Sequence, residues 1–269
     1  MPDTALPWKE MTPAIDTTKL MILRIRPYTF FVCVGLTVAI SAYLLLLLKR
    51  DGEFKPLLIR LLLSLLAIPV GAKLLGGIGN LIFALSEGRS PDWKTFLSGG
   101  IAYYGGLAGL LLAFGLLGRR PRMRSKDAED ALAVVIPVFH TFGRIGCFCS
   151  GCCYGAEHAG FLSVHYTNLI EGVAVTADRI PVQLIEAGGN LLIFTALLLR
   201  FLHGRRDLVW VYLPLYAVLR ILTELLRGDA LRGMIGPISM SQLISILVLI
   251  ATAIHYKKRG RERRNVESV

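Results

Sequence analysis

The sequence predicts an all-α integral membrane protein that crosses the bilayer seven times, and three observations carry this prediction. Apolar residues make up 54% of the 269 residues and charged residues only 18%, whereas soluble domains carry about 25% charge. The mean hydropathy is +0.58, and the apolar residues gather into long uncharged runs. The net charge of +11 would suit a nucleic-acid binder, but such proteins are not this apolar, so we expect no nucleic-acid partner. Disorder is excluded because disordered chains are poor in apolar residues.

Seven apolar stretches are long enough to be membrane helices. The first, Tyr28–Leu48, has 21 residues without charge, and a hydrocarbon core about 30 Å thick needs about 20. Because the bilayer offers no water to unpaired backbone groups, stretches of this length should be helical. The other six are Leu57–Leu85, Leu97–Gly118, Ala131–Gly155, Val182–Leu202, Leu208–Leu226 and Ile238–Tyr256.

Charge placement predicts the orientation of these spans. The C-terminal tail and the first, third and fifth connections, which share one side of the membrane, hold sixteen Lys and Arg residues. The N-terminal segment and the other connections, on the opposite side, hold nine. The positive-inside rule therefore places the C-terminus in the cytoplasm and, with seven spans, the N-terminus outside. Arg24 and Arg26 beside the first span argue against this orientation.

The predicted spans and their orientation divide the chain into three segments. Residues 1–27 are a polar, interfacial segment that does not resemble a cleaved signal. Residues 28–256 hold the seven spans, and residues 257–269 form a basic cytoplasmic tail. The polar connection at about 156–180, between the fourth and fifth spans, is expected to be a small periplasmic head, and the other interpretation is a plain solvated loop.

Five basic side chains fall within the apolar stretches, where charge is costly and each is a functional candidate. Arg60 and Arg200 lie near span ends, and we expect both to reach the membrane interface. Lys73 lies deeper, and its role stays open. The other two are Arg144 and Arg220.

Arg144 and Arg220 fit a phosphate site. Arg144 lies between Gly143 and Gly146, and small neighbours allow a second helix or a lipid headgroup to approach closely. Arg220 and Glu224 are four residues apart, which places them on one helix face. A planar guanidinium suits phosphate oxygens in a dry setting, although a structural ion pair would use the same spacing.

Other polar residues accompany the two arginines. Arg227 lies one turn beyond Glu224. Gln183 and Glu186 begin the fifth span, and we expect them to pair with Arg144 or Arg179.

Five segments of the chain resemble motifs of one known family, the bacterial prolipoprotein diacylglyceryl transferases. Together they extend over most of the chain from Tyr28 to Ile250, in the family's order. They are Tyr28 with Gly35, the run Gly99–Gly106, the run from Asp130 through Gly143 to Gly155, the run Arg179–Glu186, and Tyr216–Arg227 followed by Ile238–Gln242.

The resemblance implies transfer of a diacylglyceryl group from phosphatidylglycerol, or a related phospholipid, to the lipobox cysteine of a prolipoprotein. The reaction forms a thioether and releases glycerol phosphate in the bacterial inner membrane, among membrane lipids and without a cofactor or metal. The candidate catalytic residues are Tyr104, His140, Cys152, Arg220 and Glu224. The implied substrate-binding residues are Tyr28, Gly105, Gly106, Gly143, Arg144, Gly146, Gln183, Glu186 and Arg227.

Three positions depart from the family's motifs, so the chain resembles a divergent, cysteine-rich member. Tyr104 stands where the family has histidine, Cys147 where it has asparagine, and Cys152 where it has glutamate. Tyrosine is a poor base near neutral pH because its ordinary pKa is about 10. His140 lies one helical turn before Arg144 and is a substitute base or a structural histidine.

Four of the five cysteines lie within seven residues, at Cys147, Cys149, Cys152 and Cys153. Packing, a disulfide and a metal site are three interpretations. The fourth is a nucleophilic thiol activated by Arg144.

Two other functions remain open. The chain is either a paralogue with a changed acceptor or donor, or a membrane thiol-redox or metal-handling protein on the same fold. A transporter is disfavoured because the sequence has no evident internal repeat.

Overall fold

The computed structural model describes residues 14–16, 26–49, 54–86, 88–90, 92–170, 173–228, 234–235 and 238–267. The chain is mostly helical, at 77%, as predicted. The helices are α1 (Pro27–Leu48), α2 (Phe54–Leu65), α3 (Ala67–Ser86), α4 (Trp93–Ser98), α5 (Tyr103–Leu117), the 3-10 turn η1 (Pro121–Met123), α6 (Lys126–Cys149), α7 (Val182–Leu202), α8 (Val209–Leu225) and α9 (Met240–Glu267).

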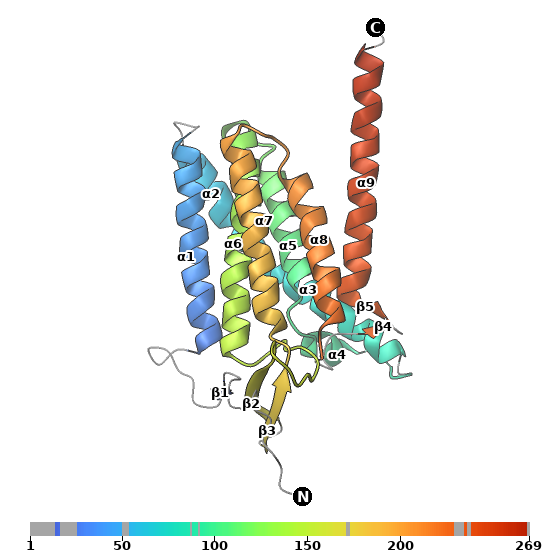
Figure 1. Ribbon diagram of the computed structural model, residues 1–269. Helices are drawn as coiled ribbons and strands as arrows, with labels where there is room; N and C mark the ends of the chain where they lie inside the picture. The colour runs from blue at the N-terminus through green and yellow to red at the C-terminus, as the bar shows by residue number, and fades with distance from the viewer. Residues whose placement is uncertain are drawn as a thin grey trace, which may run out of the picture.

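Local sequence sets several helix boundaries. Pro27 is the first residue of α1, where a missing backbone N–H costs nothing. The Ser125 hydroxyl accepts a hydrogen bond from the Ala128 N–H and caps α6, whose first turn also carries acidic residues. Helix α6 packs between α1 and α7, α3 packs on α5, and α8 lies between α7 and α9 (Figure 1).

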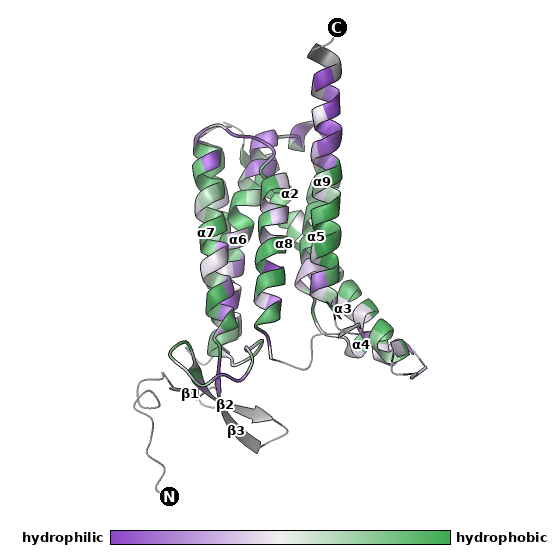
Figure 2. Ribbon diagram, turned by 45° about the vertical axis from the view of Figure 1, so that its right-hand side comes forward, coloured by the Kyte–Doolittle hydropathy of each residue, from purple (hydrophilic) through white to green (hydrophobic). Residues whose placement is uncertain are grey.

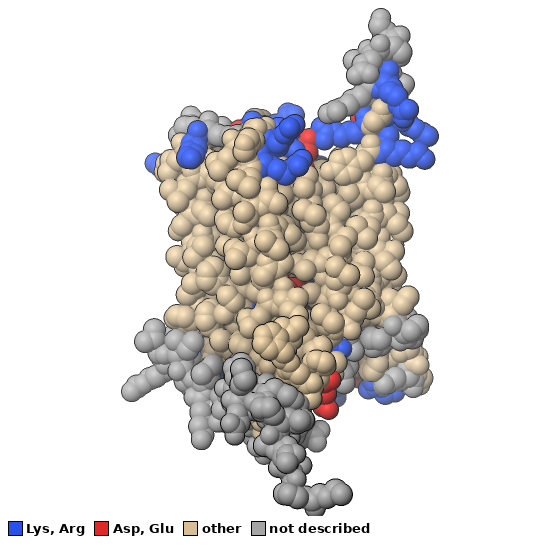
Figure 3. All heavy atoms as spheres, in the orientation of Figure 1, with Lys and Arg blue, Asp and Glu red and all other residues tan. Residues whose placement is uncertain are grey.

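Five helices of the described chain are long and apolar enough to cross a membrane. They are Pro27–Leu48, Phe54–Ser86, Lys126–Cys149, Val182–Leu202 and Met240–Glu262. The apolar helix α5 and the helix α8 are shorter, with 15 and 17 residues. Figure 2 shows the apolar residues along the middle of the bundle, and Figure 3 shows Lys and Arg side chains gathered at the end where the C-terminus lies.

The predicted second span lies within one candidate crossing, Phe54–Ser86, in which a turn at Leu66 separates α2 from α3. Two predicted span boundaries were wrong. The third helix begins at Tyr103 and not at Leu97, because Leu97 belongs to the short helix α4. The fourth ends at Cys149, so Cys152 and Cys153 lie in the loop that follows.

A small sheet, which the sequence analysis did not predict, occupies the connection between α6 and α7. Strands β2 (Val164–Ile170) and β3 (Val173–Arg179) form an antiparallel hairpin. Strand β1 (Ala14–Asp16) pairs with β2 in parallel, so part of the N-terminal segment joins this sheet. The sheet lies beyond one end of the helices (Figure 1). A second pair, β4 (Met234–Ile235) and β5 (Ile238–Ser239), precedes α9.

Glycines allow the helices to approach closely at two contacts. A Cβ atom on Gly35 of α1 would lie 2.7 Å from the Cβ of Phe142 on α6. A Cβ on Gly105 of α5 would lie 2.2 Å from the carbonyl oxygen of Gly71 on α3. Small residues at such contacts give tight van der Waals packing, which is the main force between helices in lipid.

Arg60 lies inside the protein at the end of the bundle formed by η1 and the first turn of α6. Its side chain is fully buried and donates to the carbonyl oxygens of Phe114 at 2.8 Å and Met123 at 3.0 Å. It also lies 3.5 Å from the carboxylate of Glu129. The Phe114 carbonyl, in the last turn of α5, also accepts a hydrogen bond from the Gly118 N–H at 3.0 Å, so Arg60 is a second donor that ties α2 to this turn.

Lys73 and Arg200, two more of the basic residues in the apolar stretches, have different surroundings from Arg60. The Lys73 ammonium donates to the carbonyl oxygens of Leu97 and Gly99, each at 2.6 Å, and thereby attaches the segment after α4 to α3. Arg200 is exposed at the end of α7.

Candidate active site

Glu186 on α7 joins the two arginines that the sequence analysis singled out. Its side chain is 1% exposed, and its Oε1 forms an ion pair with Nη2 of Arg144 at 2.9 Å. Its Oε2 accepts a hydrogen bond from Nη1 of Arg220 at 3.3 Å. The predicted pairing of Glu186 with Arg144 is confirmed, and one carboxylate bridges α6 and α8.

Arg220 has further partners on its own helix and on α9. Its Nη2 forms an ion pair with Glu224, at the predicted spacing of four residues. The same nitrogen donates to the hydroxyl of Ser241 at 3.2 Å. Two guanidinium groups therefore face two carboxylates in the interior, a balance of charge that makes their burial tolerable.

His140 lies beside this network and contacts Arg144. Its Nε2 accepts a hydrogen bond from Nε of Arg144 at 3.2 Å, which requires the proton to reside on Nδ1. The imidazole stacks on the ring of Tyr103, with centroids 3.9 Å apart. Asn190 faces the imidazole. The Nδ1 atom of His140 and the Oδ1 atom of Asn190 are both buried, and neither forms a hydrogen bond with another described residue.

Tyr103, rather than Tyr104, covers the histidine. The hydroxyl of Tyr104 lies 2.6 Å from Oγ of Ser245 on α9. The hydroxyl of Tyr103 lies 2.7 Å from that of Tyr212. Consecutive helical residues point about 100° apart, so only one tyrosine stacks on the imidazole, and the motif alone did not indicate which. Sequence reasoning missed Tyr103 for this reason.

Sequence reasoning also missed Tyr216 and Asn190. Tyr216 donates its hydroxyl to Oε1 of Glu186 at 3.4 Å. Asn190 lies one turn after Glu186, and its Nδ2 donates to the Glu186 carbonyl at 2.8 Å. Tyr216 lies four residues before Arg220, and Asn190 lies four residues after Glu186. This spacing, which places each pair on one helix face, could have indicated both residues.

Arg144 also faces the end of α6 near the sheet. Within the described residues its Nη1 makes no hydrogen bond, and its side chain is 10% exposed. The thiols of Cys147, Cys152 and Cys153 and the phenol of Tyr28 lie within its electrostatic reach. Arg144 therefore lies between the buried carboxylate network and a more accessible group of side chains.

Gln183 and Arg227 hold the loop after α6. Gln183 donates from Nε2 to the carbonyl oxygen of Cys152 at 2.7 Å. Arg227 at the end of α8 forms a β-bridge with Gly155. Arg179 pairs with Glu157 at 2.8 Å and not with Glu186, so that alternative pairing is not formed.

The candidate glycines have different surroundings. A Cβ on Gly143 would meet nothing within 4 Å, so this face of α6 is open beside Arg144. A Cβ on Gly146 would lie 3.2 Å from Cα of Tyr28, which places Gly146 against α1. Gly105 and Gly106 face Gly71, Ile68 and Ala72 on α3, so their described contacts are with that helix.

All five cysteines belong to the described residues, and all five are free. The disulfide interpretation is therefore not borne out. Cys147, Cys152 and Cys153 are close together, whereas Cys33 and Cys149 are not part of that group.

These features define a class of protein: a helical membrane protein with arginines buried at the same depth as lipid, next to an open helix face. Such a site is typical of enzymes that handle anionic phospholipid headgroups. The family is shown by direct comparison. A sequence model of prolipoprotein diacylglyceryl transferases matches residues 17–257, and the chain belongs to this family.

Individual relatives agree with that assignment. The chain is 26% identical over 258 residues to phosphatidylglycerol–prolipoprotein diacylglyceryl transferase 2 of Clostridium perfringens, covering 89% of this chain and 94% of that protein. It is 28% identical over 208 residues to the enzyme of Clostridioides difficile, covering 76% and 79%. The Geobacter sulfurreducens enzyme is 31% identical over 195 residues, covering 66% and 70%.

Proposed function

We propose that this chain transfers a diacylglyceryl group from phosphatidylglycerol to the lipobox cysteine thiol of a prolipoprotein. The observation that carries the proposal is the bridge from Arg144 through Glu186 to Arg220. These residues come from three helices and lie in the segments that resemble the family's motifs. Membership of the family and the names of the relatives support the same reaction.

Arg144 is the proposed phosphate-binding residue. Its Nε and Nη2 are engaged by His140 and Glu186, which fix the plane of the guanidinium. Its Nη1 has no hydrogen bond within the described chain and points a donor pair to a ligand. The open face at Gly143 leaves room for a headgroup, and Tyr28 is close enough to contribute to the same site.

The reaction forms one bond and breaks another. The acceptor sulfur forms a bond to the terminal glyceryl carbon of the diacylglyceryl group, and the bond from that carbon to the phosphate oxygen breaks. The electron pair stays on the phosphate, and the thiol proton ends on the departing glycerol phosphate. Arg144 and Arg220 stabilise the charge that grows on the leaving phosphate.

Other residues hold the arginines or contact the lipid. His140 positions Arg144 through its Nε2, and Glu224 orients Arg220 through the ion pair on α8. Tyr104 retains a hydroxyl in the position that resembles the family's histidine and can hydrogen-bond the lipid. A covalent route through the Cys152 thiol remains a second mechanism, and a lipid adduct trapped on the purified protein would reveal it by mass spectrometry.

The proposed topology has seven spans, with the C-terminus in the cytoplasm of a bacterial inner membrane. The concentration of Lys and Arg at one end of the bundle supports this orientation (Figure 3). Helices α5 and α8, about 22 and 26 Å long at 1.5 Å per residue, supply the two additional crossings. The β-sheet then lies in the periplasm with the Cys147 end of α6. A topology reporter fused after Val269 should be active only in the cytoplasm.

Complementation tests the proposed function. Cells depleted of their own diacylglyceryl transferase should regain lipidation of a model prolipoprotein when they express this chain. An inserted but inactive protein would favour the paralogue with a changed acceptor or donor. Arg144→Ala should abolish the rescue, and Arg200→Ala, which alters an exposed arginine at the end of α7, should preserve it.

A further inference from the structure

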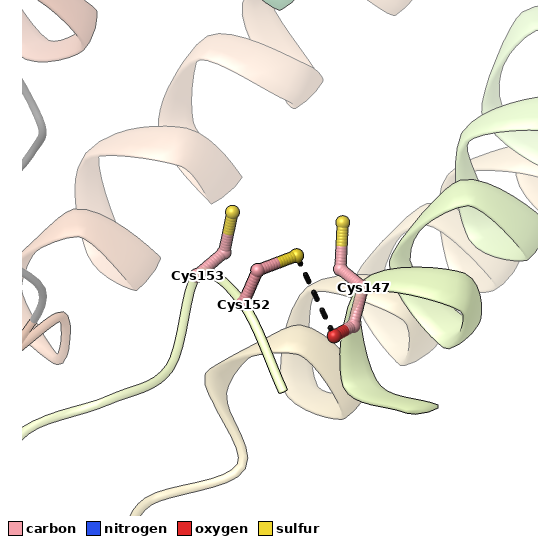
Figure 4. A group of neighbouring side chains, drawn as sticks. All are labelled: Cys147, Cys152 and Cys153. Atoms are coloured by element: carbon pink, nitrogen blue, oxygen red, sulfur yellow. Dashed lines mark hydrogen bonds between the residues drawn. The ribbon is translucent and has the colours of Figure 1, made fainter. Parts of the chain in front are cut away.

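Direct transfer from the phospholipid to the acceptor thiol uses none of the three thiols beside Arg144. The Sγ atoms of Cys147, Cys152 and Cys153 all lie within 4.8 Å of one another. Figure 4 shows that Cys147 projects from the last turns of α6 and that the other two project from the loop that follows. We call these residues the thiol cluster.

Three hydrogen bonds hold the loop that carries Cys152 and Cys153 against α6, α7 and the end of α8. The Cys152 N–H donates to the Cys147 carbonyl at 3.1 Å, which folds the loop back on α6. Gln183 of α7 donates to the Cys152 carbonyl at 2.7 Å. The Gly228 N–H, after α8, donates to the Tyr154 carbonyl at 3.2 Å. The three thiols are therefore placed by fixed elements.

The turn that brings the thiols together uses unfavourable backbone geometry. Cys153 has a φ of +58°, which is uncommon for a residue with a side chain. Gly151, two residues earlier, has a φ of +65°. Strained residues of this kind persist where the surrounding structure enforces them, and they concentrate at ligand sites.

Positive charge lies beside the cluster. Arg144 acts on all three thiols, and Arg227 acts on Cys153. Deprotonated sulfur is the form that binds metals.

We propose that Cys147, Cys152 and Cys153 form a binding site for a soft, thiophilic cation such as Zn²⁺ or Cu⁺. In a tetrahedral zinc site with Zn–S bonds of about 2.3 Å, sulfur atoms lie about 3.8 Å apart. Small side-chain rotations would bring Sγ atoms that lie within 4.8 Å of one another to that spacing. Three sulfur ligands select soft cations over Mg²⁺ or Ca²⁺.

Charge and protons balance at such a site. Binding of Zn²⁺ releases three thiol protons to the solvent and leaves three thiolates around a divalent ion. The resulting single negative charge faces Arg144 and Arg227. A fourth coordination position stays open to water because the described residues bring no further Cys, His, Asp or Glu ligand atom into this group. This inference does not depend on the proposed transferase activity.

Metal titration of the full-length protein tests the inference. The protein is purified in detergent with a phosphine reductant, stripped with a chelator, and titrated with Zn²⁺ alone. Cd²⁺ is then used because thiolate-to-cadmium charge transfer gives an ultraviolet absorption band. We expect one tightly bound ion per chain and a band whose intensity corresponds to three thiolates.

Matched serine variants locate the site. Cys147→Ser, Cys152→Ser and Cys153→Ser should each weaken binding at least tenfold, and the triple variant should abolish it. Cys33→Ser and Cys149→Ser, which alter free cysteines that are not part of the cluster, should bind as the wild type does. Equal binding by the triple variant, or no binding by the wild type, would overturn the inference.

A second measurement needs no variants. The native protein is alkylated with and without Zn²⁺ and mapped by mass spectrometry. Zn²⁺ should slow alkylation of Cys147, Cys152 and Cys153 at least tenfold while the rate at Cys33 is unchanged. Equal alkylation of the three thiols in both samples would also contradict the metal site.

Discussion

The carboxylate of Glu186 forms an ion pair with Arg144 at 2.9 Å, in the interior between α6 and α7. The other oxygen of the same carboxylate accepts a hydrogen bond from Arg220 of α8 at 3.3 Å. Both guanidinium groups therefore take their position from one buried side chain. This makes Glu186 as important to the site as the two arginines that we propose to bind the phosphate.

Glu186→Gln should destabilise the protein and abolish transfer. Removing one partner of a buried ion pair costs about 3–5 kcal/mol because the remaining charge is uncompensated. Thermal unfolding in detergent measures the stability, and lipidation of a model prolipoprotein measures the activity. Glu157→Gln is the control, because that carboxylate is exposed and surface pairs contribute about 0–1 kcal/mol. Equal effects of the two substitutions would contradict the bridging role.

Arg144→Lys should lower the transfer rate about a hundredfold or more, which is the usual cost of losing a donor to transition-state charge. Lysine keeps the positive charge but lacks the planar fork that contacts His140, Glu186 and a phosphate together. The matched substitution Arg200→Lys at the exposed end of α7 should leave the rate unchanged. A lysine variant with wild-type activity would show that charge alone suffices.

His140→Ala should lower the rate by about a hundredfold through misplacement of Arg144. His140→Gln should restore much of the activity, because a side-chain oxygen can accept the same hydrogen bond, whereas a proton-accepting role would not be restored. Tyr104→Phe removes one hydrogen bond to Ser245, worth about 1 kcal/mol. Intact transfer in His140→Ala together with complete loss in Tyr104→Phe would refute this assignment.

Gly35→Ala should destabilise the protein by about 1–3 kcal/mol, because the new methyl group would lie 2.7 Å from the Phe142 side chain. Gly188→Ala is the control, since nothing lies within 4 Å of its added methyl group, and a helical alanine is favoured over glycine. Thermal unfolding of the two variants in the same detergent gives the comparison. Similar unfolding temperatures would argue against close packing of α1 on α6.

The sequence predicted most of the helices and the pairs within one helix. Arg220 and Glu224 were placed together by their spacing, and the apolar runs located most of the helices. The contacts of Arg60 were not predictable, because they depend on where the last turn of α5 lies relative to α2. The choice between Tyr103 and Tyr104 depends on the rotation of α5, which consecutive aromatic residues leave undetermined.

The β-hairpin was missed for another reason. Its two strands have seven residues each and are joined by Glu171 and Gly172, so a local hairpin signal was present and was overlooked. The pairing of β1 with β2 was not predictable in this way, because β1 comes from a distant part of the chain. The thiol cluster was visible in the sequence only as a run of cysteines. The grouping of Cys147 with Cys152 and Cys153, but not with Cys149, required coordinates.

The most direct test of the account is a transfer assay with purified components. The protein is mixed with phosphatidylglycerol and a lipobox peptide, and the peptide is analysed by mass spectrometry. The account predicts a diacylglyceryl thioether on the peptide cysteine, release of glycerol phosphate, and loss of both in Arg144→Ala. An unmodified peptide from properly inserted wild-type protein, with the phospholipid unconsumed, would contradict it.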